Sequence, residues 1–146
     1  MRTKDVYEVI NQDERFSILA EILESTGMGE EILNDQKVFT FFAPTDDALA
    51  HLSRPAIELL KSPKGRDLAK ALISRHVIPG QYLYSDELRM RNSLRPLRGG
   101  DVMISVENNA VRFGRAPVRT PGIAARNGVI FPVDRMQPVP RRTLAA

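Results

Sequence analysis

The chain contains no cysteine. This absence excludes disulfides, thiol chemistry, cysteine-ligated zinc and iron–sulfur centres, and it fits a cytosolic protein and a bacterial secreted protein equally well. Histidine is also scarce, because only His51 and His76 are present. A three-histidine zinc site made by side chains of this chain alone is therefore impossible, and no other spacing indicates a metal or a cofactor.

Long apolar runs are missing as well. No stretch approaches the about 20 residues that a membrane-spanning helix needs, so no transmembrane segment is expected. The N-terminal sequence MRTKDVYEVINQDERF also lacks the apolar core of a signal peptide. We expect an extracellular or periplasmic protein if a leader has been removed, and a cytoplasmic protein otherwise.

Charge is unevenly distributed along the 146 residues, a length that suits one domain with its own core. The net charge is +3, yet residues 1–80 carry 10 basic and 13 acidic groups, whereas residues 81–146 carry 11 and 5. All eleven basic residues of the second part are arginine. This excess favours an anionic partner, and a merely solvated surface is the alternative reading.

The stretch VFTFFAPTDDALAHL, residues 38–52, is the most informative local pattern. Residues 38–43 predict a strand that is apolar on both faces and therefore covered on both, and Pro44 ends it. Thr45 is a natural N-cap for a following helix, and Asp46 and Asp47 place negative charge at the positive end of that helix dipole. The two carboxylates thus have a structural role; binding of a cation or of a partner's arginine is the alternative.

Elsewhere the first half has helical periodicity and the second half has strand periodicity. Helices are expected near residues 6–10, 16–27, 55–60 and 66–74. A hairpin is expected over residues 101–114 with a turn at Asn108 and Asn109, and shorter strands are expected at 93–97, 116–120, 127–131 and 133–136. Helices followed by strands, with one early strand among the helices, indicate an α+β domain.

Four segments resemble the fasciclin-type adhesion domain. They are TFFAPTDDA (residues 40–48), FSILAEILESTGM (16–28), LISRHVIPGQY (72–82) and NGVIFPVDRMQP (127–138). The residues that carry these motifs are Thr40, Phe42, Pro44, Thr45, Asp46, His76, Asn127 and Gly128.

The resemblance implies a single domain over residues 5–138, followed by a flexible tail at 139–146, in a bacterial member of the family. It implies a wedge-shaped β-sandwich of about seven strands, with N-terminal helices packed at one end. The implied function is adhesion or protein interaction rather than catalysis. Val133 and Asp134 correspond to the Asp-Ile-like pair to which integrin binding is attributed in animal members.

The sequence departs from the family pattern at two places. Phe131 and Pro132 stand where the second signature has histidine and a small or aliphatic residue, and proline removes one ladder amide. Arg75 replaces the tyrosine that often precedes the central histidine. We therefore expect the local geometry around residues 131–132 to differ from the family pattern.

No catalytic pattern emerges from the chain, so no enzyme is expected. The sequence has no nucleophile elbow, and Gly99–Gly100 lacks a phosphate-binding context. His76, at the end of a helix, is interpreted as a hydrogen-bonded packing residue, and His51 as solvent-exposed.

Arginine is the candidate partner-binding residue type of the second half. Two groups of arginines stand out: the first is Arg89, Arg91, Arg95 and Arg98, and the second is Arg112, Arg115 and Arg119. If the strands that carry the two groups are neighbours, the arginines form one basic face that could bind carboxylate, sulfate or phosphate groups. Few aromatic side chains are available there for base stacking. We therefore rank an acidic protein face, a polysaccharide or lipid headgroups above nucleic acid.

A carrier of a hydrophobic small ligand such as a carotenoid is the alternative function. It rests on the apolar cluster Tyr82, Leu83, Tyr84, Leu88 and Met90, which otherwise completes the core.

Overall fold

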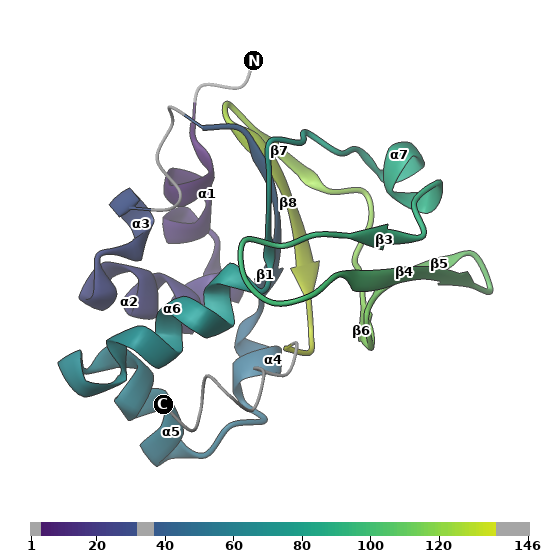
Figure 1. Cartoon of the computed structure of the whole chain (residues 1–146). Coiled ribbons are helices and arrows are strands. Elements are labelled where there is room, and N and C mark those ends of the chain that lie inside the picture. Colours follow the sequence, from purple (N-terminus) through teal and green to yellow (C-terminus); the bar gives the residue numbers. More distant parts are fainter. Residues whose placement is uncertain (1–3, 32–36, 137–146) are drawn as a thin grey trace.

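The computed structural model describes residues 4–31 and 37–136, in which most of the helices pack on one face of a first sheet and a second sheet lies on its other face (Figure 1). The helices are α1 (Val6–Gln12), α2 (Ser17–Thr26), α3 (Met28–Glu31), α4 (Asp46–Leu49), α5 (Arg54–Lys61), α6 (Arg66–Ser74) and α7 (Ser85–Arg89). The strands are β1 (Phe39–Pro44), β2 (Val77–Pro79), β3 (Ser93–Leu94), β4 (Val102–Glu107), β5 (Ala110–Phe113), β6 (Ala116–Pro117), β7 (Ile123–Ala125) and β8 (Gly128–Val133).

Two four-stranded sheets carry the topology. Their strand orders are β2-β1-β8-β7 and β3-β4-β5-β6. β1 and β8 are parallel, the other paired strands are antiparallel, and a single bridge between Val118 and Val133 links the sheets. The predicted α+β sandwich is confirmed, with eight described strands instead of about seven. The expected tail at 139–146 lies outside the described residues.

β1 lies between two hydrophobic cores, as its apolar pattern predicts. Phe39, Phe41 and Ala43 pack into the core shared with the helices. Phe42 points into the second core, between the sheets, where its ring stacks on Phe113 at 4.0 Å and on Phe131 at 5.5 Å between ring centroids. Every residue of β1 is buried. The strand therefore forms part of both cores at once.

Several element boundaries follow from local sequence signals. Asp5 caps α1 in a capping box with Glu8, α2 ends before Gly27, and α6 spans the predicted 66–74. Asn108 and Asn109 adopt positive φ values of 50° and 67° in the turn between β4 and β5, which confirms the hairpin.

Other boundaries differ from the prediction. Val38, predicted to begin the strand, precedes β1 and is 47% exposed, whereas β1 ends at Pro44 as predicted. β3 and β6 are two residues long, shorter than the strands expected at 93–97 and 116–120. The strand expected at 127–131 continues through Pro132 to Val133 as β8, and the separate strand expected at 133–136 is not formed, because residues 134–136 lie outside any strand.

Pro132 does not interrupt β8, because its backbone nitrogen and oxygen point away from β1. The Val133 oxygen accepts from Thr45 N of the β1 side at 3.0 Å, whereas the Pro132 oxygen accepts from Arg119 N at 3.0 Å. Since successive residues of a strand present their N and O atoms to opposite sides, the proline nitrogen faces away from β1. The ladder between β1 and β8 thus loses no hydrogen bond at Pro132.

Gly128 is required by the close approach of β1. A Cβ at this position would lie 2.2 Å from the Phe39 carbonyl oxygen, a backbone atom that cannot rotate away.

We expect Gly128→Ala to lower the free energy of unfolding by about 1–3 kcal/mol or more, as overpacking does, measured by urea denaturation. Gly100→Ala is the matched control because nothing lies within 4 Å of the place that its added methyl group would occupy. Equal stability of the two variants would contradict the tight pairing of β1 with β8.

Candidate functional site

Thr45 and Asp134 meet because the parallel strands β1 and β8 end at the same edge of their sheet. The Thr45 hydroxyl donates to Asp134 Oδ1 at 2.8 Å and accepts from Ala48 N at 3.3 Å. The predicted N-cap of α4 is thereby confirmed. The same hydroxyl joins the end of the first signature segment to the end of the second. We call these contacts, with those of Arg119 and Asp46 below, the junction.

Arg119 completes the junction from the loop before β7. Its Nε and Nη2 atoms donate to Asp134 Oδ2 at 3.2 and 2.7 Å. Partial burial by itself would raise the pKa of Asp134, but hydrogen bonds from Arg119 and Thr45, together with the charges of Arg119 and Arg15, lower that pKa below its ordinary value of 3.8. The carboxylate is therefore ionised at neutral pH and already engaged.

Asp46, in α4, accepts hydrogen bonds from the first residues of α2. Its Oδ1 accepts from Ile18 N at 2.9 Å and its Oδ2 accepts from the Ser17 hydroxyl at 2.5 Å. Phe16, the N-cap residue of α2, offers no side-chain hydrogen bond. Asp46 thus satisfies free donors at the start of α2 from a distant part of the chain. The sequence indicated its structural role but not this partner.

A small polar cleft of about 200 Å³ opens beside the junction. It is lined by Arg15, Thr45, Asp46, Asp47, Arg119 and Asp134. Arg15 is itself paired with Asp13 at 2.8 Å. Most of the lining charges therefore hold the fold together, and the exposed Asp47 lies at the rim. Val133 is buried in the second core, so its side chain positions Asp134 and is not presented to solvent.

The remaining motif residues also tie elements together. Asn127 is buried and accepts from Val6 N at 2.9 Å, which fixes the start of α1 against β8. The Thr40 hydroxyl donates to the Gln81 oxygen at 2.8 Å and accepts from Leu83 N at 3.0 Å. Both polar groups are buried and hydrogen-bonded, as structural polar groups are.

His76 is a packing residue, as predicted. It lies between α6 and β2 without solvent exposure, its Nδ1 is 2.8 Å from the Leu72 oxygen, and its ring is 6.2 Å from that of Phe113. Burial lowers the pKa of His76 to about 4, with a further lowering by the charge of Arg75, against the raising effect of the Leu72 hydrogen bond. The imidazole is therefore neutral at physiological pH. His51 is exposed, as predicted.

The predicted partner-binding arginines lie on several elements of the fold. β4 lies between β3 and β5, so the two groups are not on adjacent strands. Arg89 donates to the side-chain and main-chain oxygens of Asn109 at 3.1 and 2.9 Å. Arg112 lies 3.7 Å from Glu107, and Arg119 belongs to the junction. The structure therefore does not gather all seven into one cluster of contacts.

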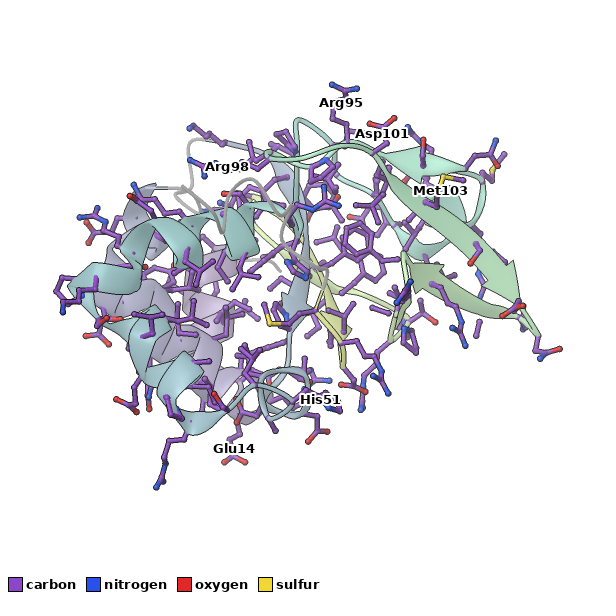
Figure 2. The ribbon with its side chains drawn as sticks, turned by 60° about the horizontal axis from the view of Figure 1, so that its bottom comes forward. Glu14, His51, Arg95, Arg98, Asp101 and Met103 are labelled. Carbon is purple, nitrogen blue, oxygen red and sulfur yellow. The ribbon has the colours of Figure 1, made fainter. Side chains whose placement is uncertain are left out.

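Arg91, Arg95 and Arg98 are exposed on one segment, residues 90–101, which includes β3 and which we call the basic loop. Arg95 pairs with Asp101 at 3.1 Å, and the Arg95 side chain remains 80% exposed. Neither Arg91 nor Arg98 forms an ion pair with another described residue. Figure 2 shows Arg95, Arg98 and Asp101 along one edge of the molecule, opposite Glu14 and His51. Arg115 is exposed on the turn before β6.

Arg75 anchors the basic loop, a role that the sequence did not reveal. Its Nη1 donates to the oxygens of Arg98 and Gly100 at 3.1 and 2.7 Å. Gly99 between them has a φ of 81°, and a Cβ there would lie 2.5 Å from the Arg75 Nη1 atom. The replacement of a family tyrosine by arginine was the only signal at this position. Arg75, which stands in place of that tyrosine, thus holds the backbone of the basic loop through two hydrogen bonds.

Other site types receive no support from the described residues. Among them no group of three or more His, Cys, Asp or Glu side chains is arranged to hold a metal ion. No helix within the described ranges is long and apolar enough to cross a membrane. Of the residues that suggested a ligand carrier, Leu83 and Leu88 are buried in the second core, whereas Tyr84 and Met90 are 40% and 83% exposed.

Comparisons with known proteins agree with the fold. The Fasciclin domain model matches residues 14–137. Protein sll1483 of Synechocystis sp. is 29% identical over 131 residues, which cover 90% of this chain and 71% of that protein. Transforming growth factor-beta-induced protein ig-h3 of Sus scrofa is 30% identical over 129 residues, 88% of this chain but only 18% of that protein.

A solved structure shows the same fold. The FAS1 domain pair of the insect cell adhesion molecule fasciclin I superposes with a TM-score of 0.79 at 16% identity, covering 97% of this chain and 53% of that chain. The present chain therefore spans about half of the insect domain pair and less than a fifth of ig-h3.

The junction predicts a measurable stability. Thr45→Ala removes the cap of α4 and a hydrogen bond to Asp134, so we expect the free energy of unfolding to fall by about 1 kcal/mol or more. In a double-mutant cycle with Asp134→Ala, which removes the acceptor, measured by urea denaturation, the two losses should not add, because the residues share one contact. Strict additivity would show that the hydroxyl and the carboxylate act separately.

His76 predicts a pH-dependent stability. The unfolded chain protonates this residue near 6.5 and the folded chain only near 4, so its contribution is complete above pH 6.5 and is lost as the pH falls toward 4. The loss should reach roughly 3 kcal/mol over that range. Urea denaturation from pH 4 to pH 7 should show this slope reduced in His76→Asn and retained in His51→Asn. An unchanged slope in His76→Asn would contradict the assignment.

Proposed function

Because the chain belongs to the fasciclin family, we propose that it is a non-enzymatic interaction module that binds another macromolecule through the basic loop. The proposal rests on one observation: Arg91, Arg95 and Arg98 are exposed on a segment whose backbone Arg75 holds in place. Guanidinium groups presented in this way suit carboxylate, sulfate or phosphate groups on a partner.

The charge of the basic loop indicates the class of partner. Asp101 is the one carboxylate within residues 90–101, against three arginines. An anionic surface, such as an acidic protein face, a polysaccharide or lipid headgroups, is therefore the favoured partner. Such binding needs no reaction centre, in keeping with a role in adhesion.

The structural comparison is compatible with this role. The insect protein that shares the fold is described as a cell adhesion molecule. An adhesive module of this kind acts outside the cytoplasm, and we propose an extracellular or periplasmic location on that ground. The proposal for binding itself depends on the residues of this chain and does not depend on the location.

Charge reversal tests the proposed function. We expect the wild-type chain to be retained on a heparin column, used as an anionic polymer, and the variant Arg91→Glu, Arg95→Glu and Arg98→Glu to elute at distinctly lower salt. Salt screens the attraction between exposed arginines and the anionic polymer, and replacing each arginine with glutamate turns that attraction into repulsion, so less salt is needed for elution.

A control variant separates the basic loop from net charge. Lys37→Glu, Arg54→Glu and Lys64→Glu reverses three exposed cations outside the loop and changes the net charge equally. It should elute close to the wild type if the loop binds. If both variants elute at the same salt concentration, or if the wild type is not retained, the basic loop is not the binding surface.

A further inference from the structure

Exposed apolar side chains accompany the arginines of the basic loop. Met90 is 83% exposed, Met103 is 64% exposed and Leu97 is 45% exposed. Single exposed apolar residues are common on protein surfaces, but here three large ones lie on or next to the segment that carries three exposed arginines. A purely electrostatic partner does not account for them.

These side chains lie on or next to the segment that carries the arginines: Met90 and Leu97 belong to the basic loop, and Met103 lies on β4, the strand that pairs with β3. Met103 pairs with Ser93 across β4 and β3, and it points outward because its neighbours Val102 and Ile104 are buried. Met90 directly follows α7, three residues before β3 begins. In Figure 2, Arg98, Arg95, Asp101 and Met103 follow one another along one edge of the molecule.

The backbone beneath this edge is fixed. Leu94 and Pro96 are buried, and Leu97 N donates to the Val77 oxygen of the first sheet at 2.9 Å. With the anchor from Arg75, the segment between Arg91 and Arg98 is tied to both sheets and to the end of α6. The apolar tips therefore protrude from a preorganised support, and binding would order little additional backbone.

We propose that this edge docks on the surface of an anionic phospholipid bilayer. The arginines would contact headgroup phosphates and carboxylates, while Met90, Leu97 and Met103 would enter the boundary between headgroups and acyl chains. The inference rests on the proposed function, since it assigns a chemical class to the partner of the basic loop.

A bilayer fits the observations better than an acidic protein face. Among the described residues, clefts at Arg15, at Lys4 and at Ile18 are lined by residues outside the basic loop. What the loop presents is protruding flexible side chains between cations. Such side chains enter a bilayer without a matching pocket, whereas a protein partner would have to supply one for each.

Vesicle binding tests the docking. In co-sedimentation with the full chain, vesicles of phosphatidylcholine and phosphatidylserine should bind at least about tenfold more tightly than vesicles of phosphatidylcholine alone, and added salt should weaken the binding. The double variant Met90→Ser and Met103→Ser should bind the anionic vesicles several-fold more weakly while eluting from heparin with the wild type. Val38→Ser with Leu59→Ser, which also removes two exposed apolar side chains, should bind as the wild type does.

A fluorescence reporter tests insertion directly. The chain has no tryptophan, so Met103→Trp introduces a single indole at the proposed contact. Its emission should shift to shorter wavelength with anionic vesicles and be quenched by brominated acyl chains, whereas a Val38→Trp reporter should do neither.

The outcomes separate the two proposals. Retention on heparin without preference for anionic vesicles would overturn the bilayer inference and leave the anionic-partner proposal standing, with an acidic protein or polysaccharide as the partner. Loss of both would overturn both. Vesicle binding that is unchanged in Met90→Ser with Met103→Ser, or a Met103→Trp reporter without a shift, would also overturn the inference.

Discussion

The parallel pairing of β1 with β8 is the constraint on which the rest of the structure depends. β1 is covered on both faces, by the helices on one side and by the second sheet on the other. Because the two strands run in the same direction, Thr45 and Asp134 emerge at the same edge and bond to each other. The fold is thus closed by a contact between residues that are 89 positions apart in the sequence.

This arrangement engages the residues of the signature segments in the fold, apart from the basic loop that we propose as the binding surface. Asp46, His76 and Asn127 are engaged in holding helices and strands together. The basic loop, in contrast, leaves two of its arginines without an ionic partner among the described residues while its backbone is fixed. Binding residues on loops positioned by a rigid scaffold are a common division of labour in proteins. The proposed function assigns the binding role to the arginines of the basic loop, and the bilayer proposal adds Met90, Leu97 and Met103.

Local patterns predicted most elements, and long-range contacts account for what they missed. Three features depend only on residues that are adjacent in the sequence and were predicted correctly. They are the burial of both faces of β1, the N-cap at Thr45 and the turn at Asn108–Asn109. The passage of β8 through Pro132 could not be predicted, because it depends on which side of the strand faces β1. The same holds for the support of the basic loop by Arg75, which spans 23 residues or more.

Amide hydrogen exchange tests the central claim most directly. If β1 and β8 form the inner pair that joins two cores, the amides of Phe41 and Ile130 should exchange only through global unfolding, with opening free energies equal to the stability measured by denaturant. The amides at the exposed tip of the β4–β5 hairpin should exchange much faster. Exchange of the β1 and β8 amides at rates close to those of the hairpin tip would contradict the account.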